Sequence, residues 1–373
     1  MKNQLNIYVE EACRKGLSDG VFYGVSAAVS MWNKKGRNRG WYSGGMTRFD
    51  LEGVAIQKKT LFDLASLTKP LCTTLSILHL IATGKLHWDE ACLSLLDLTI
   101  SPEKKLITVK NILNHSSGLP SYKPYFEKFF PEFNETVKNS LIEKILEEPL
   151  EYLPATTCRY SDLGFILLGK IIERLTNKSL DSFYKKVVTD PLKLSLDLCF
   201  LPHNQPSPVS NHLVAATELC GWRNRIIQGE VHDEHCCLLG GVSGHAGLFG
   251  NVESVLTLCE LILDIWKNRA SHPAFPNTLL QQALTTKHPT ESWCLGFDTP
   301  SPGLSSSGSY FSSKSVGHLG FSGTSFWIDP ERDIIIILLT NRIHPSRENI
   351  KIRQFRPFFH DYLMERMISD CVL

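Results

Sequence analysis

The sequence lacks an excess of charge of either sign. Its 373 residues include 39 lysines and arginines against 38 aspartates and glutamates, which gives a formal net charge of +1. The densest basic cluster, residues 34–39, has the composition of a turn between two strands. Because no basic face is available to attract a polyanion, we expect no nucleic-acid partner.

Long hydrophobic runs are also missing. The longest, residues 334–339, has the length of a buried strand, whereas a membrane span needs about 20 apolar residues. Residues 1–16 lack the apolar core and cleavage site of a signal peptide and have the pattern of an amphipathic helix. We therefore expect no membrane partner and a cytoplasmic location.

The eleven cysteines lack the paired C-x-x-C spacing of zinc ribbons and redox motifs. Most of them lie in apolar segments, so we expect reduced thiols that fill the core. This cysteine usage agrees with a cytoplasmic location.

The composition, 43% hydrophobic and 21% charged, is that of a globular protein, and the length allows roughly two domains. Strand patterns lie near both ends: one hairpin is predicted from residues 25–32 and 40–45, another from 317–328 and 334–341. Helices are predicted at residues 4–18, from about 65 to 82, and at 88–96, 108–115, 163–175, 252–266 and 349–367. This order predicts an α+β fold.

The arrangement of these elements suggests two domains. Residues 1–84 and 206–373 are predicted to form an antiparallel sheet flanked by helices. Residues 85–205 are predicted to form an inserted, mainly helical domain without a clear strand. Within it, Thr108 and Asp162 have the residue types and positions of helix caps.

An S-x-x-K motif opens the most apolar of these helices. Ser66 and Lys69 are three residues apart, so both leave the same face of a helix that begins near Ala65. A desolvated amine can take the proton of a serine hydroxyl and make the oxygen a nucleophile. The first turn of the helix can supply backbone N–H groups to an oxyanion. Taken alone, the motif is short enough to occur by chance.

Two further motifs follow in order. Tyr160-Ser161-Asp162 precedes an apolar helix, and His318-Leu319-Gly320 lies on the first strand of the late hairpin. Together the three motifs resemble those of the serine β-lactamase and penicillin-binding protein superfamily, S-x-x-K, [YS]-x-N and K-T-G. Residues 62–69, 113–120 and 317–323 resemble most closely its class C β-lactamase-related branch, which includes esterases and D-Ala peptidases.

The resemblance implies a β-lactamase/transpeptidase-like fold, an α/β/α sandwich, and a serine hydrolase that acts through an acyl-enzyme without a cofactor or metal. Ser66 is then the nucleophile, and Lys69 and Tyr160 share its proton. In this branch a partly ionised tyrosine is usually the favoured base, although the sequence leaves the choice open. The backbone N–H groups of Ser66 and Phe321 are expected to hold the oxyanion.

The same resemblance implies that Asp162, His318 and Gly320 contact a small-molecule or peptide substrate. Asp162 replaces the usual asparagine, which favours a protonated Lys69 and shifts the role of base toward Tyr160. His318 replaces lysine and grips a carboxylate less firmly. Both changes remove positive charge where the carboxylate of a penicillin or of D-Ala-D-Ala would dock. We therefore expect an esterase or a hydrolase of peptidoglycan fragments more than an efficient β-lactamase.

Two other functions stay open at this stage. The two departures also fit a non-catalytic relative that binds peptidoglycan fragments or a protein partner. Residues 232–237 contain the residue types of a metal site, but their spacing matches no zinc pattern, and we interpret them as a solvated loop beside the pocket. His115 and His245 are interpreted as loop residues. The oligomeric state is not predicted.

Overall fold

The computed structural model describes residues 3–33, 36–129, 134–207, 209–288 and 292–372. Residues 34 and 35 of the predicted basic turn and the side chain of Cys371 lie outside the described part. The principal sheet has five antiparallel strands in the order β2-β1-β10-β9-β8. Their bounds are β1 (Gly24–Asn33), β2 (Gly36–Gly45), β8 (Val316–Leu319), β9 (Ser325–Asp329) and β10 (Ile334–Thr340).

Both ends of the chain build this sheet, as predicted. Strand β1 pairs with β10 so that Val25 lies opposite Thr340 and Met31 opposite Ile334. The late segment differs in one respect, because a turn at residues 320–324 divides the strand expected at 317–328 into β8 and β9. The edge strand β8 therefore carries His318 and ends beside that turn.

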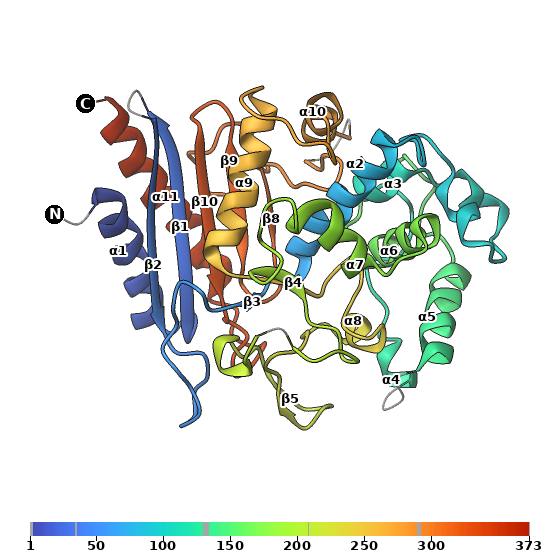
Figure 1. The fold of residues 1–373 in the computed structure, drawn as a ribbon, viewed down its shortest axis with the longest axis horizontal. Helices are drawn as coiled ribbons and strands as arrows, with labels where there is room; N and C mark the ends of the chain where they lie inside the picture. Colours follow the sequence, from blue (N-terminus) through green and yellow to red (C-terminus); the bar gives the residue numbers. More distant parts are fainter. Residues whose placement is uncertain (1–2, 34–35, 130–133, 208, 289–291, 373) are drawn as a thin grey trace.

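Strand β10 is apolar on both faces because helices cover both sides of the sheet. Ile334, Ile336 and Leu338 join a core with α1 (Gln4–Ser18) and α11 (Ile352–Val372). The alternate residues of the strand face a second core that includes α9 (Val252–Trp266). Figure 1 shows α1 and α11 on one side of the sheet and α9 on the other. The observed layers confirm the predicted α/β/α sandwich.

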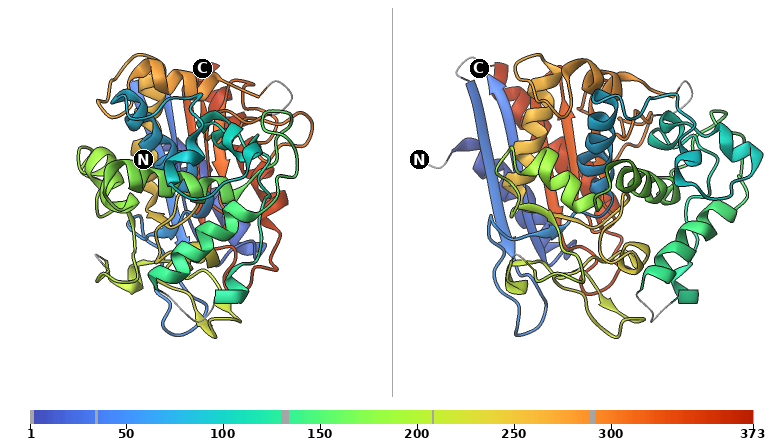
Figure 2. Two further views of the ribbon diagram at one scale, coloured as in Figure 1. Left: turned by 90° about the vertical axis from the view of Figure 1, so that its right-hand side faces the viewer. Right: turned by 45° about the vertical axis from the view of Figure 1, so that its right-hand side comes forward.

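Helices and loops beside the sheet share the second core (Figure 2). The helices are α2 (Leu75–Ala82), α3 (Val109–Leu113), α4 (Phe126–Phe129), α5 (Glu135–Glu147), α6 (Asp162–Thr176), α7 (Leu180–Tyr184) and α10 (Asn277–Thr285). Residues 85–205 are thus mainly helical, but the expectation that they contain no strand is wrong. Strand β4 (Leu198–Phe200) pairs there with β7 (Leu248–Gly250), which also pairs with β3 (Phe62–Asp63).

Two further short strands and a short helix lie in the loop region that precedes β7. They are a two-stranded sheet of β5 (Leu219–Cys220) and β6 (Arg225–Ile226), and the helix α8 (Glu234–Leu238). By length and composition, the continuous helical stretch Ala65–Ala82 could cross a membrane. However, 78% of it is buried inside the fold, which is the pattern of a core helix. Ten cysteines in the described chain are free, in agreement with the expected reduced thiols.

Candidate active site

Ser66 lies in a tight turn at the start of the core helix. The turn, Ala65–Leu67, leads into a π-helical stretch, Lys69–Thr74, and then into α2. Ala65 has φ of 49°, a conformation that strains any residue other than glycine, and the Asp63 carboxylate accepts a hydrogen bond from its N–H at 2.8 Å. The strained turn holds the Ser66 side chain at the wall of a cavity of about 690 Å³.

The predicted nucleophile, amine and phenol come together in this cavity. Lys69 Nζ donates a hydrogen bond to Ser66 Oγ at 3.0 Å, and the Tyr160 hydroxyl donates to the same oxygen at 2.8 Å. The helical spacing of Ser66 and Lys69 is responsible for the first contact. The second depends on the fold, because Tyr160 arrives from the loop before α6.

Lys69 is fully buried and has two further partners. Its Nζ donates to the backbone carbonyl of His245 at 3.1 Å and forms an ion pair with Asp162 Oδ1 at 2.7 Å. Burial lowers the pKa of Lys69, while the charge and hydrogen bond of Asp162 act in the opposite direction without cancelling the effect. The expectation that Asp162 weakens Lys69 as a base is therefore only partly correct, since desolvation is the larger influence.

Tyr160 is not the partly ionised phenol that the resemblance implied. Burial raises its pKa well above the usual value, and the negative charge of Asp162 raises it further. Its ring lies tilted against the rings of His115 and Trp293, with centroid distances of 4.6 Å and 5.6 Å. Tyr160 is consequently a protonated hydrogen-bond donor at neutral pH.

Asp162 begins α6 but does not cap it. The preceding Ser161 is the cap, since its hydroxyl accepts a hydrogen bond from the Gly164 N–H at 3.4 Å. Asp162 instead faces Lys69, with a fifth of its side chain exposed to the cavity. By contrast, Thr108 caps α3 as predicted and forms a capping box with Asn111.

The late motif, His318-Leu319-Gly320, lines the same cavity. His318 is buried, its Nδ1–H donates to the Leu319 carbonyl at 2.8 Å, and burial lowers its pKa to about 3. It is therefore neutral near pH 7, not partly charged as expected. Gly320 has no room for a side chain, because a Cβ there would lie 2.0 Å from Thr324 Oγ1 and 2.7 Å from the Leu64 carbonyl.

Phe321 follows directly and lies at the mouth of the cavity, with 49% of its surface exposed. No hydrogen bond of its backbone N–H is found in the described part of the chain. An N–H without a hydrogen-bond partner among the described residues is available to a substrate oxygen, and the oxyanion role that the resemblance implied for it stays a prediction. The Phe321 carbonyl is held by the Arg342 guanidinium at 2.9 Å.

The segment 232–237 is not a solvated loop. It enters α8, whose residues are all buried. His232 pairs with Glu218 at 2.9 Å, and Asp233 pairs with His245 Nε2 at 2.8 Å. One ligand atom each from Asp233, His235 and His245 lies within 4.8 Å of the others, a separation that a metal ion could bridge. His245 is a structural loop residue, as expected, and its carbonyl also holds Lys69.

The sequence reasoning missed several residues that shape this cavity. Asp63 links three segments that line the cavity. Its carboxylate accepts hydrogen bonds from the backbone N–H groups of Ala65 and His232, and its backbone carbonyl accepts one from the Ser322 hydroxyl. The Trp293 ring lies tilted against Tyr160 and meets His115 edge to face. Apart from the contact between Asp63 and Ala65, these contacts join residues more than 100 positions apart, so no local pattern in the sequence predicts them.

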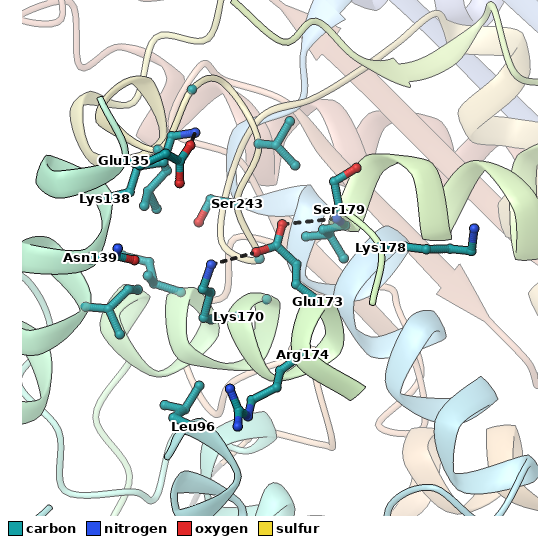
Figure 3. Close-up of a pocket in the computed structure, with 18 of the residues that line it drawn as sticks. Leu96, Glu135, Lys138, Asn139, Lys170, Glu173, Arg174, Lys178, Ser179 and Ser243 are labelled. Atoms are coloured by element: carbon teal, nitrogen blue, oxygen red, sulfur yellow. Dashed lines mark hydrogen bonds and ion pairs between the residues drawn. The ribbon is translucent and has the colours of Figure 1, made fainter. Parts of the chain in front are cut away.

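A second, larger cavity of about 1300 Å³ lies among the helices of residues 85–205. Figure 3 shows its polar lining, in which Lys170 and Glu173 of α6 form an ion pair. Lys138 and Glu135 of α5 are paired in the same way at 2.6 Å. Ser243 lines this cavity and shares a 2.8 Å hydrogen bond with His245, so residues 243–246 form a wall between the two cavities.

Comparison with known proteins identifies the family. A sequence model of the Beta-lactamase family matches residues 9–356, which is most of the chain. The chain belongs to the β-lactamase family. The predicted fold and the predicted class of enzyme, a serine hydrolase that acts through an acyl-enzyme, are thereby confirmed.

Two curated relatives of this β-lactamase-family chain are bacterial. An N-acetylmuramyl-L-alanine amidase of Bacillus subtilis (strain 168) is 33% identical over 319 residues, which is 78% of this chain and 69% of the relative. A putative D-alanyl-D-alanine carboxypeptidase of Escherichia coli (strain K12) is 30% identical over 313 residues, 76% of this chain and 70% of the relative.

A solved structure shows the same fold at lower identity. The D-amino acid amidase of Ochrobactrum anthropi SV3 superimposes with a TM-score of 0.72, covers 99% of both chains and is 18% identical. This likeness confirms the architecture of the β-lactamase-family chain.

Proposed function

We propose that this chain hydrolyses an amide or ester bond of a peptidoglycan fragment, with Ser66 as the nucleophile. The observation that carries the proposal is the position of Ser66 Oγ, 3.0 Å from Lys69 Nζ and 2.8 Å from the Tyr160 hydroxyl in one cavity. The curated relatives, named as an amidase and as putative carboxypeptidases, support the substrate class.

Acylation begins with transfer of the Ser66 proton to Lys69. Burial favours the neutral amine that can accept this proton, and Asp162 at 2.7 Å stabilises the ammonium that results. Ser66 Oγ attacks the substrate carbonyl, and the backbone N–H groups of Ser66 and Phe321 hold the oxyanion. The sequence left the roles of Lys69 and Tyr160 open, and the opposite directions of their pKa shifts support this division of roles.

Collapse of the tetrahedral intermediate requires a proton for the leaving group. Tyr160 is the donor, because burial and Asp162 keep its hydroxyl protonated. The phenolate recovers a proton from the Lys69 ammonium, because Lys69 Nζ and the Tyr160 hydroxyl lie 3.0 Å and 2.8 Å from the same atom, Ser66 Oγ. Lys69 is then neutral again and activates the water that hydrolyses the acyl-enzyme.

A non-catalytic binding protein is the second candidate, motivated by Asp162 and His318. The contacts of these two residues support the enzyme instead. Asp162 pairs with Lys69, and His318 is a neutral wall residue whose ring lies 6.1 Å from that of Tyr160. Neither disrupts the contacts at Ser66 Oγ, and this favours the enzyme.

The test is intact-protein mass spectrometry after incubation with a p-nitrophenyl ester, a penicillin and a D-Ala-D-Ala peptide. We expect an acyl adduct or turnover with the wild type, and a loss of turnover on the order of 10³-fold or more in Ser66→Ala. Ser346→Ala, an exposed serine on the loop next to the cavity, serves as the matched control. Turnover unaffected by Ser66→Ala, or no adduct and no turnover from folded protein, would refute the assignment.

We also propose that the protein works in the cytoplasm. The ten free cysteines of the described chain support this location, because thiols in such number persist in a reducing compartment.

A further inference from the structure

Three side chains of the types that bind metal ions lie beside the wall between the two cavities. One ring nitrogen each of His235 and His245 and one carboxylate oxygen of Asp233 lie within 4.8 Å of one another. We call these three residues the histidine cluster. Both histidines are buried, and 24% of the Asp233 side chain is exposed. The steps proposed at Ser66 use none of these three ligand atoms.

A turn of the chain brings the second histidine back to the first. Asp233 and His235 lie two residues apart at the start of α8, and His245 follows ten residues after His235. Gly240 and Gly241, with φ of 87° and 88°, allow the chain to turn after the helix. The spacing within residues 232–237 matched no zinc pattern because the third ligand comes from beyond this turn.

The His235 ring has no polar partner in its surroundings. Its side chain is fully buried, and among the buried histidines of the described chain it alone lacks a hydrogen-bond partner at both ring nitrogens. The rings of Tyr122, Tyr125 and Phe126 contact it, with centroid distances of 5.1, 5.6 and 6.3 Å. Burial lowers its pKa, so the ring has the neutral form that binds metals. A bound ion relieves the cost of burying such a polar group.

His245 has the additional partner that orients a metal-binding histidine. Its Nε2 lies 2.8 Å from Asp233 Oδ1, and its Nδ1 lies 2.8 Å from the Ser243 hydroxyl. Because a hydroxyl both donates and accepts, the ring proton can reside on Nδ1 and leave Nε2 free to bind an ion. Metal-binding histidines usually donate their other ring N–H in this way. Asp233 is held in place as well, since Oδ1 accepts from the Cys236 N–H at 2.8 Å.

We propose that the histidine cluster binds a zinc ion. Two imidazoles and one carboxylate form a donor set that suits zinc, whereas calcium and magnesium take oxygen ligands. Zn–N bonds of about 2.0–2.1 Å place two ligands of a tetrahedral ion about 3.3 Å apart. Ligand atoms up to 4.8 Å apart therefore approach by at most about 1.5 Å, which rotation of the side chains provides. Three protein ligands leave the fourth position to water.

A zinc ion at this position joins two segments beside Ser66. Asp233 and His235 belong to the start of α8, and His245 belongs to the loop before β7. The carbonyl of His245 accepts a hydrogen bond from Lys69, so the same loop is attached to the core helix. Because the three ligands come together only in the folded chain, we expect zinc to stabilise the fold.

The test is titration calorimetry with zinc chloride on protein that has been treated with EDTA and desalted. We expect one zinc ion per chain in the wild type and loss of this binding in His235→Phe. A phenyl ring suits the aromatic surroundings and removes an imidazole without a partner, so the variant is expected to fold. His272→Phe, which changes a buried histidine outside the cluster, is the matched control and keeps the site.

Two further variants test the other ligands. Ser243→Ala removes the partner of His245 Nδ1 and is expected to weaken zinc about 10-fold or more. Asp233→Asn keeps a residue that can cap α8 but removes the charged ligand, so it is also expected to weaken zinc. Unchanged zinc affinity in both variants would contradict the proposed ligand set.

The free cysteines of the described chain are alternative zinc ligands, and cobalt distinguishes them from the histidine cluster. Thiolate ligands give bound cobalt an intense charge-transfer absorption that nitrogen and oxygen ligands do not give. We expect a cobalt spectrum without that absorption, and a melting temperature that zinc raises in the wild type but not in His235→Phe. Absence of stoichiometric zinc binding, a thiolate absorption, or zinc binding that His235→Phe leaves unchanged overturns the inference.

Discussion

Replacing Asp162 by asparagine tests the balance of charge around Ser66. The Asp162 carboxylate lies 2.7 Å from Lys69 Nζ, so its loss removes the charge that favours the ammonium, and the pKa of Lys69 falls. The same carboxylate raises the pKa of Tyr160, so its loss makes the phenol easier to ionise. Asp162→Asn is therefore expected to move both limbs of the pH profile of kcat/KM to lower pH.

The size of the movement follows from the separation of the charges. Two unit charges at 2.7 Å interact by about 1.5 kcal/mol in bulk water and by about 6 kcal/mol at an effective dielectric constant near 20. Lys69 is fully buried and Asp162 is 20% exposed, so the pair falls between these limits. At about 1.4 kcal/mol per pH unit, we expect the acidic limb to move by roughly one to four units.

The assay is kcat/KM for a neutral ester across the pH range in which the protein remains folded. Glu348→Gln, an exposed acid on the loop beside the cavity, is the matched control and leaves both limbs in place. An acidic limb that stays fixed in Asp162→Asn, or moves to higher pH, would show that Lys69 is not the proton acceptor. A fixed alkaline limb with a moving acidic limb would remove Tyr160 from the proton-transfer steps.

Two further predictions concern the late motif and the clustered metal-type ligands. Gly320→Ala places a Cβ 2.0 Å from Thr324 Oγ1, so we expect the free energy of unfolding in urea to fall by about 1–3 kcal/mol. In the control variant Gly221→Ala no atom lies within 4 Å of the added Cβ, and we expect the free energy of unfolding to change by less than about 0.5 kcal/mol. Equal stabilities would contradict the tight packing at Gly320. Removal of metals by a chelator is expected to leave ester hydrolysis unchanged, because the proposed steps use only side chains and backbone. Activity that a chelator abolishes and zinc restores would point instead to Asp233, His235 and His245.

Local patterns predicted much of the fold. Helices α1 and α9 lie at the predicted residues, and the apolar run of β10 is a strand because it is buried on both faces. The sequence analysis predicted a single strand at residues 317–328. It missed the turn at Gly320 and Gly323, which divides this segment into β8 and β9. Strand β4 was missed because three residues are too short for a periodic pattern.

The sequence by itself determined the residue types of the site and one of its contacts. Ser66 and Lys69 meet because helical spacing joins positions three apart, and Gly320 is required by the close approach of Thr324. The protonation states were decided by the tertiary structure, because a pKa depends on burial and on charges from distant parts of the chain. For that reason Tyr160 proved to be a protonated donor and His318 a neutral residue. The cavity itself likewise exists only in the folded chain, where α11 and the segment after β10 reach it from positions about 300 residues after Ser66.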